Sequence, residues 1–137
     1  MKRNKHKLYM GIAQAVAKFG TCGRAQVGAI LVKDGRVMGT GYNGAPAGEA
    51  HCADVGCLLI RRWGKDHCAT AIHAEVNAIL NARSDVRGAT LYCTHEPCYD
   101  CMRLLINAGI SRIIYKREYP GSKKTPLLKN SILKEKL

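Results

Sequence analysis

Residues 89–115 read ATLYCTHEPCYDCMRLLINAGISRIIY, and their pattern determines the fold class that we predict. The two ends of this stretch, 89–94 and 112–115, are short runs rich in aliphatic and aromatic residues, which predicts two strands. The middle, 98–108, has helical apolar spacing and is followed by Gly109, a residue typical of helix C-termini. Because two strands connected through a helix run parallel in one sheet, the stretch predicts an α/β protein.

The residues upstream extend this order of elements. We expect a helix over 8–19, strands over 27–32 and 37–40, a glycine-rich loop over 41–48, an irregular segment over 51–67 and a helix over 72–82. The Asp34-Gly35 pair between the two strands is typical of a hairpin turn. The order helix-strand-strand-helix-strand-helix-strand predicts a mixed sheet covered by helices.

Apolar spacing also predicts which helix faces are buried. In the first helix the inward face would consist of Leu8, Ile12, Ala15, Val16 and Phe19. In the helix over 98–108 we expect both Leu104 and Leu105 to face inward. The four apolar residues Leu127, Leu128, Ile132 and Leu133 predict a last, marginal helix near the C-terminus.

The positive charge lies at the two ends of the chain. The formal net charge is +12 over 137 residues, and nine of these charges belong to the basic segments 1–7 and 116–137. Charge at the termini is typical of solvated ends, whereas a nucleic-acid-binding protein carries it on a folded face. We therefore expect one domain over 1–137, with basic tails and no nucleic-acid partner.

Neither a membrane span nor a signal peptide is expected. No run approaches the roughly 18–20 apolar residues that span a bilayer, and the charged start of the chain lacks a cleavage-like site. We expect a cytoplasmic protein without a membrane partner, in the host cytoplasm if a phage encodes it. In that compartment, seven cysteines favour metal binding or catalysis over disulfides.

Two short motifs, His73-Ala-Glu75 and Pro97-Cys98-Tyr-Asp-Cys101, carry the chemistry. Two cysteines three residues apart at a helix start share one face, so that both sulfurs reach one ion. With His73 they supply three ligands and leave one tetrahedral position open, as in catalytic zinc sites. Glu75 is placed to move protons to and from a water that the metal activates.

Each motif has a simpler interpretation when it occurs alone. A lone C-x-x-C is often a redox pair or half of a structural zinc site, and a lone H-x-E is often a helix surface. The two together, with Pro97 rigidifying the approach to Cys98, predict a hydrolytic zinc site.

In these motifs the chain resembles the zinc-dependent cytidine deaminase superfamily, and within it the bacterial and phage deoxycytidylate (dCMP) deaminases. The resemblance runs from about Cys22 to Tyr115 and is carried by residues 22–29, 41–46, 51–52, 56–57, 67–68, 73–78, 97–101 and 106–110. It implies a three-layer α-β-α fold with a mixed five-stranded sheet. It further implies hydrolysis of dCMP to dUMP and ammonia, which supplies dUMP for thymidylate synthesis.

The resemblance also assigns roles at the substrate. Glu75 would protonate the cytosine ring and the departing ammonia, while the Ala74 amide would hold the base carbonyl. Asn43, in the Gly-Tyr-Asn-Gly loop, would contact the deoxyribose, although a turn Asn is the simpler interpretation. The monophosphate needs a cation or several donors, for which Arg24 and Tyr119 are candidates.

Regulation and a second metal follow from the same resemblance. Many relatives are hexamers activated by dCTP and inhibited by dTTP, which makes Gly41, Tyr42, Gly44 and Arg83 candidates for effector or subunit contacts. A second, structural zinc seen in some relatives would use Cys22, Cys52, His67 and either Cys57 or Cys68. The alternative is that these small thiols only fill the core.

Three other functions compete with this interpretation. A tRNA adenosine deaminase shares the metal residues, but the loop over 41–46 and the extra cysteines favour a nucleotide substrate. A cytosine nucleotide deaminase could also accept CMP or dCTP. A zinc-stabilised nucleotide-binding module without activity would not need Glu75.

Overall fold

The computed structural model describes residues 3–120, 128 and 132–137. The helices are α1 (Lys5–Ala17), α2 (Cys52–Val55), α3 (Ala74–Asn81) and α4 (Tyr99–Ala108). The strands are β1 (Gly28–Lys33), β2 (Arg36–Tyr42), β3 (Leu59–Arg62), β4 (Lys65–Cys68), β5 (Thr90–His95), β6 (Arg112–Arg117) and β7 (Leu133–Lys136).

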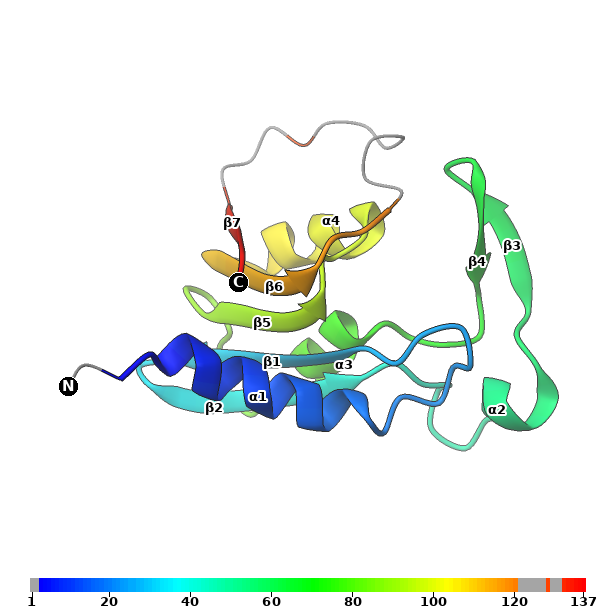
Figure 1. Ribbon diagram of the computed structural model, residues 1–137, viewed down its shortest axis with the longest axis horizontal. Helices are drawn as coiled ribbons and strands as arrows, with labels where there is room; N and C mark the ends of the chain where they lie inside the picture. Colours follow the sequence, from blue (N-terminus) through cyan, green and yellow to red (C-terminus); the bar gives the residue numbers. More distant parts are fainter. Residues whose placement is uncertain (1–2, 121–127, 129–131) are drawn as a thin grey trace.

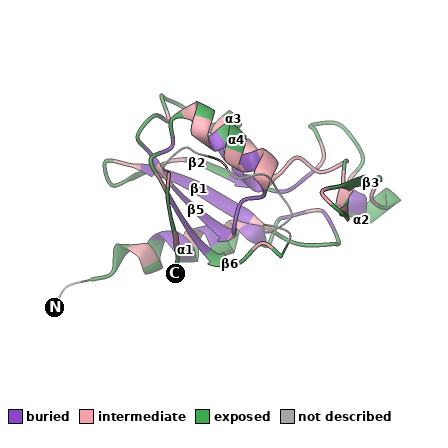
Figure 2. Ribbon diagram, turned by 90° about the horizontal axis from the view of Figure 1, so that it is seen from above, coloured by how far each residue is buried: buried purple, intermediate pink, exposed green. Residues whose placement is uncertain are grey.

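Five strands form one mixed sheet in the order β2-β1-β5-β6-β7 (Figure 1). β1 runs antiparallel to both β2 and β5, whereas β5, β6 and β7 run parallel to one another. Helix α1 covers one face of the sheet, and α3 and α4 cover the other (Figure 2). The predicted three-layer α/β fold with a mixed five-stranded sheet is confirmed.

The core has two parts, one on each face of the sheet. Leu31, Leu91 and Ile113 face α3 and α4, together with Leu105 of α4. On the opposite face, residues of α1 pack against Ile30 and the other strand residues that point toward that helix. The alternation of neighbouring strand residues between the two faces follows from the two-residue period of a strand.

The turn between β1 and β2 forms as its sequence predicts. Asp34 and Gly35 both have positive φ, 52° and 73°, as a two-residue hairpin turn of this type requires. A glycine also ends α4, where Gly109 adopts the left-handed conformation that its type favours.

Two predicted helix faces are wrong in part: in α1, Ile12 and Val16 pack against the core as expected, but Leu8 and Ala15 are exposed. The buried residues of α1 are Tyr9, Met10, Ala13 and Ala17, whereas Phe19 lies beyond the helix and is 70% exposed. The helix begins earlier than predicted because the Asn4 side chain caps it, and Ala13 and Ala17 let its backbone lie directly against Gly28 at the start of β1. In α4 Leu105 is fully buried, but Leu104 is 50% exposed because neighbouring helix positions point in different directions.

The C-terminal helix predicted from Leu127, Leu128, Ile132 and Leu133 is also wrong at its described end. Leu133 starts strand β7, which pairs with β6, while residue 127 lies outside the described residues. Arg112 of β6 binds both carboxylate oxygens of Glu135, at 2.8 and 3.1 Å. This ion pair stabilises β7, whose four residues are too few and too charged to predict a strand from sequence. Part of the expected basic tail therefore belongs to the sheet.

Two further segments differ from the prediction. Gly41 and Tyr42 end strand β2 instead of starting a loop, and Gly41 lies directly against α3. The segment over 51–67, expected to be irregular, contains α2 and the β3–β4 hairpin, which stands apart from the main sheet (Figure 1). Among the described residues, no helix has the length and apolar character needed to cross a membrane.

Candidate metal centre and nucleotide pocket

The two sequence motifs meet at the N-termini of α3 and α4. His73 and Cys98 occupy the N-cap positions of these helices, and neither side chain makes a capping hydrogen bond. Cys101 lies in the first turn of α4. The side chains of all three residues are therefore free to converge on one point.

The three donor atoms form one compact group. His73 Nδ1 lies 3.1 Å from Cys101 Sγ and 3.5 Å from Cys98 Sγ, and all three ligand atoms lie within 4.8 Å of one another. Cys98 and Cys101 are buried. Two sulfurs and an imidazole nitrogen are donors that suit zinc, so these residues fit such an ion.

The hydrogen bonds within this group shift the pKa values of Cys98 and His73 in opposite directions. The hydrogen bond with Cys101 has the largest effect on the pKa of Cys98, and the bond with His73 adds to it; both lower this pKa, which is about 4. The bond with Cys98 in turn raises the pKa of His73 to about 9. The N-terminal end of α4 also favours a thiolate over a thiol. The arrangement thus favours the thiolate form of Cys98.

Glu75 lies beside this group in the first turn of α3 and is 4% exposed. Burial raises the pKa of its carboxyl group above the ordinary value. Its Oε1 accepts a hydrogen bond from the Cys93 thiol at 3.5 Å, which holds the carboxylate from behind. A buried carboxyl group of raised pKa is suited to accept and return a proton.

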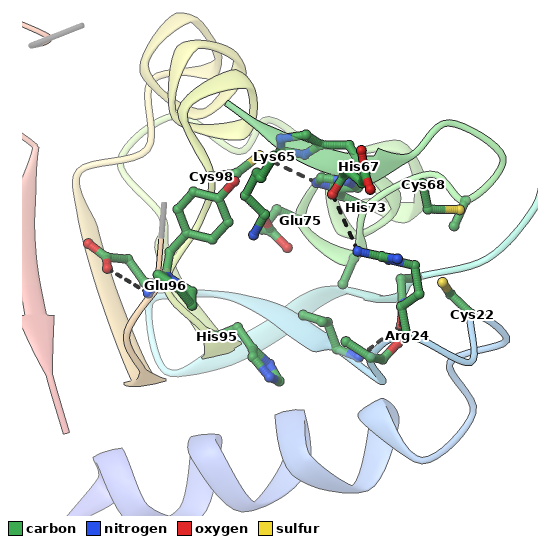
Figure 3. A pocket seen from close by; sticks show the side chains of 18 residues that line it. Cys22, Arg24, Lys65, His67, Cys68, His73, Glu75, His95, Glu96 and Cys98 are labelled. Carbon is green, nitrogen blue, oxygen red and sulfur yellow. Dashed lines mark hydrogen bonds between the residues drawn. The ribbon is translucent and has the colours of Figure 1, made fainter. Parts of the chain in front are cut away.

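A cavity of about 390 Å³ opens in front of these residues (Figure 3). His73, Glu75 and Cys98 line it, and Ala74 lines it as the first residue of α3, where a backbone N–H has no partner within the helix. The cavity therefore combines a metal-binding group, a buried carboxyl group and a free helix N-terminus.

The predicted substrate residues Asn43, Arg24 and Tyr119 all line this cavity. The Asn43 side chain also holds the backbone before β1, because Val27 N donates to its Oδ1 at 2.8 Å and its Nδ2 donates to Ala25 O at 2.7 Å. Asn43 is therefore a buried structural residue as well as a pocket residue.

Several pocket residues were missed by sequence reasoning. Lys65 of β4 lies 4.7 Å above the centre of the Tyr119 ring. Glu96 accepts from Tyr119 N at 2.9 Å and pairs with Lys134 of β7 at 2.5 Å. Glu96 directly precedes Pro97-Cys98 in the sequence, so it could have been predicted to lie near the metal site. The position of Lys65 at the cavity depends on the β3–β4 hairpin, which was not predicted.

Of the effector candidates, none lines the cavity. Gly41 faces α3, so that a Cβ there would lie 2.3 Å from Ala74 O, and Gly44 is buried and bridged to Ile72. Tyr42 and Arg83 are exposed. Only these last two offer side chains to a partner or an effector.

A second cluster contains four cysteines and no histidine. Cys22 Sγ lies 3.5 Å from Cys57 Sγ, Cys52 Sγ lies 3.4 Å from Cys68 Sγ, and all four sulfurs lie within 4.8 Å of one another. The expectation that His67 belongs to this set is wrong: its Nε2 lies 2.9 Å from Arg62 O, across the hairpin. His67 and Cys68 are neighbours in a strand, so their side chains point to opposite faces.

The cluster also favours a thiolate. Although burial opposes ionisation, hydrogen bonds from the Ala71 backbone and then from Cys52 lower the pKa of Cys68 to about 7. The bond with Cys22 raises the pKa of Cys57 to about 12.

Comparison with known proteins agrees with this geometry. Residues 3–117 match the family model described as the cytidine and deoxycytidylate deaminase zinc-binding region. Deoxycytidylate deaminase of Mycobacterium phage D29 is 47% identical over 119 residues, which cover 80% of this chain and 92% of the phage protein. ComE operon protein 2 of Bacillus subtilis is 44% identical, over 83% of this chain and 60% of that protein.

A solved structure is similar over the whole chain. It is the dCMP deaminase from cyanophage S-TIM5 in complex with dCMP and dUMP, with a TM-score of 0.80, 29% sequence identity, and coverage of 100% of this chain and 99% of the other. Together, the converging zinc donors, the buried glutamate and these similarities show that the chain belongs to the cytidine and deoxycytidylate deaminase family.

Proposed function

We propose that residues 1–137 form a single deaminase domain that hydrolyses dCMP to dUMP and ammonia and so supplies dUMP for thymidylate synthesis. The observation that carries the proposal is the meeting of His73, Cys98 and Cys101 beside the buried Glu75, at the wall of one cavity. The dCMP deaminase of cyanophage S-TIM5, which binds dCMP and dUMP, supports the choice of substrate.

His73, Cys98 and Cys101 would hold the zinc ion. When bound, zinc would supply a water whose pKa is lowered to about 7. Glu75 would take one proton from the attacking water and give it to N3 of the cytosine ring while the water oxygen bonds to C4. It would then carry the second proton, from the new C4 hydroxyl group, to the amino group, which leaves as ammonia when the C4–N bond breaks. Its burial suits this role, because a carboxyl group of raised pKa both accepts and returns a proton near neutral pH.

The remaining pocket residues would bind and orient the nucleotide. The Ala74 N–H, at the start of α3, donates to the base carbonyl. Asn43 contacts the sugar through the hydrogen-bonding capacity that its two backbone contacts leave. Arg24 and Tyr119, which also line the cavity, contact the phosphate.

Ammonia release from a panel of substrates tests this assignment. The zinc-loaded chain is offered dCMP, CMP, dCTP, deoxycytidine, 5-methyl-dCMP and a tRNA anticodon stem-loop. We expect dCMP to give the highest kcat/KM. Comparable turnover of CMP or dCTP would replace dCMP specificity with a broader cytosine nucleotide activity. Turnover of the RNA with none of dCMP would overturn the proposal. If no substrate is turned over, a nucleotide-binding module without catalytic activity is the interpretation that remains.

We propose further that Cys22, Cys52, Cys57 and Cys68 hold a second, structural zinc ion. Four sulfurs at mutual contact distances are the donor set of closed, non-catalytic zinc sites. We expect two zinc ions per fully loaded chain by elemental analysis, and one in the Cys57→Ser variant. A single ion in the fully loaded wild-type chain would contradict the second site.

Regulation by dCTP and dTTP, and assembly into a homo-oligomer such as a hexamer, complete the proposal. The exposed Tyr42 and Arg83 are the residues placed to contact an effector or a neighbouring subunit. Light scattering and initial rates with each triphosphate test both points. The seven free thiols are consistent with action in a reducing compartment such as the cytoplasm.

A further inference from the structure

A second cavity of about 470 Å³ lies next to the nucleotide cavity and shares Arg24, Ala25 and His95 with it. The other lining residues come from α1, the ends of β5 and β6, and the segment before β1. The second cavity is therefore a separate space that begins at the wall of the proposed substrate pocket.

Three cations line this second cavity: Arg24, Lys116 and Arg117. No carboxylate lines it, and among the described residues none lies within ion-pair distance of these three side chains. Arg24 makes a hydrogen bond to the Asp66 carbonyl at 3.3 Å, which orients the guanidinium without neutralising it. Three uncompensated cations around one cavity favour an anionic ligand.

The carbonyl oxygens at the end of α1 would oppose an anion, but Gln26 occupies two of the nearby ones. Gln26 Nε2 donates to Lys18 O at 3.3 Å and to Gly20 O at 3.1 Å. Gln26 itself lines the cavity, so its amide group lies between the cavity and these two carbonyl oxygens and provides each with a hydrogen bond.

His95 adds a polar ring at the wall between the two cavities. Its Nδ1 lies 2.9 Å from Thr94 Oγ1, which accepts a hydrogen bond from Gly28 N at 3.1 Å. Burial, and then the charge of Arg117, lower the pKa of His95 below its ordinary value and keep the ring neutral. A neutral imidazole offers one N–H donor and one acceptor nitrogen, so His95 is a polar wall residue that adds no charge to the three cations.

The position of the shared wall links it to the nucleotide. Asn43, the proposed sugar contact, donates to Ala25 O at 2.7 Å, and Ala25 lines both cavities. Substituents on the sugar therefore lie closest to the wall and to the second cavity, whereas the base lies at Glu75 in the first.

We propose that the second cavity is a binding subsite for a second phosphate on a deoxycytidine nucleotide, with Lys116 and Arg117 as its principal contacts. The inference rests on the proposed function, since it takes the sugar position from the deamination pocket. The same chemistry has two sources: a phosphate that extends the 5′ chain, as in dCDP, or one on the 3′ oxygen, as in deoxycytidine 3′,5′-bisphosphate.

The test compares these two nucleotides with dCMP in wild type and in the Lys116→Gln/Arg117→Gln variant. Both side chains are exposed, and the backbone bond that Arg117 O accepts from Glu96 N is kept in the variant. The matched control is Lys7→Gln/Arg36→Gln, which removes the same charge from exposed positions outside both cavities. KM is measured by ammonia release, and Kd by calorimetry with zinc-loaded Glu75→Gln protein.

When Lys116 and Arg117 are both present, we expect at least one of the two nucleotides to bind Glu75→Gln protein about fivefold more tightly than dCMP, a gain of the size of modest ion pairs. The nucleotide that gains identifies the source. The double variant should lose this gain and keep its KM for dCMP within about twofold, and the control should keep the gain.

The inference is overturned if neither nucleotide binds more tightly than dCMP, or if the double variant weakens dCMP binding by the same factor as binding of the other nucleotide. It is also overturned if the control variant loses the affinity gain to the same extent as the double variant. The second outcome would assign Lys116 and Arg117 to the single phosphate of dCMP. If no cytosine nucleotide is deaminated, the proposed function fails, and the calorimetric comparison still decides the second subsite.

Discussion

At the residue scale, the proposed zinc ligands occupy positions that usually stabilise helices. His73 and Cys98 stand at the N-caps of α3 and α4, where Ser, Thr, Asp or Asn would normally satisfy the first backbone N–H groups. Neither side chain does so here. The helix ends are therefore left with free donors and a positive dipole end, which favour thiolate and nucleotide binding in the same place.

Replacement of Glu75 should separate metal binding from catalysis. We expect Glu75→Gln to lower kcat for dCMP by about 1,000-fold or more, because general acid–base catalysis contributes on that order. Zinc content should stay unchanged, since His73, Cys98 and Cys101 remain. Ammonia release and elemental analysis check the two expectations. The exposed Glu49→Gln serves as control, and an active Glu75→Gln enzyme would rule out the assigned role.

Sequence spacing predicted the catalytic cluster better than the second one. The C-x-x-C and H-x-E spacings are local, so a helix start brings their members together. The four-cysteine cluster depends instead on where the β3–β4 hairpin begins and ends, and that hairpin has no strong strand signal. The error at His67 follows from this, because a neighbour in a strand points the other way.

At the element scale, the contact between β2 and α3 leaves no space for side chains. A Cβ on Gly41 would lie 2.3 Å from both Ala74 O and Ala78 N, atoms of the α3 backbone. The helix that carries Glu75 therefore lies directly on the strand.

We expect Gly41→Ala to lower the free energy of unfolding by about 2 kcal/mol, because the clash is with backbone and not with a flexible side chain. The shift of α3 should also lower dCMP turnover. Gly11→Ala is the matched control: it lies in α1 with nothing within 4 Å, and should raise stability by about 0.5–1 kcal/mol. Urea unfolding measures both, and equal effects of the two substitutions would contradict the contact.

The pairing of β7 with β6 should depend on pH. The Arg112 guanidinium, which hydrogen-bonds to Glu135, lowers the pKa of this carboxyl group. The contribution of the pair is thus present above the pKa that Glu135 has in the unfolded chain, and is lost as pH falls through the lower, folded pKa. We expect hydrogen-exchange protection of β7 amides to decrease over that acidic range, relative to β5.

The Glu135→Gln variant provides the control for this effect. It should show weaker β7 protection at neutral pH and no further loss that depends on this group in acid. The same pH response in the variant as in wild type would show that another group is responsible.

Most of the elements were predictable, and the exceptions have a common cause. Each of the strands β1, β2, β5 and β6 overlaps a run whose composition favours strands. Strand β7 is held by partners distant in sequence, above all Arg112, and its own residues fit a helix equally well. Tertiary contacts thus overrode local pattern at the edge of the sheet.

At the scale of the whole molecule, a chain of positive net charge places four of its basic side chains at the two cavities. The chain carries a net charge of +12, and Arg24, Lys65, Lys116 and Arg117 gather near the two cavities. Such a field raises the local concentration of a negatively charged nucleotide, and salt screens it.

We expect kcat/KM for dCMP to fall severalfold when ionic strength rises from about 20 to about 300 mM, a range over which the screening length falls well below the size of the molecule. Deoxycytidine has no phosphate, and its kcat/KM should change little. Initial rates with both substrates over the salt series make the comparison. Equal losses for both would attribute the effect to stability or zinc binding instead of substrate charge.

Cys57 and Cys68 enclose the β3–β4 hairpin, and Lys65, Asp66 and His67 of that hairpin form one wall of the nucleotide cavity. The hairpin pairs only with itself among the described strands, and its side chains connect it to α4 through the Arg62–Asp100 ion pair at 2.8 Å and the edge contact of Trp63 with Tyr99. Substitutions at residues 65–67 thus change the wall of the nucleotide cavity while the strand pairing of the main sheet is kept. The hairpin is therefore a place where related chains can diverge in substrate choice, provided that Arg62 and Trp63 keep it attached to α4.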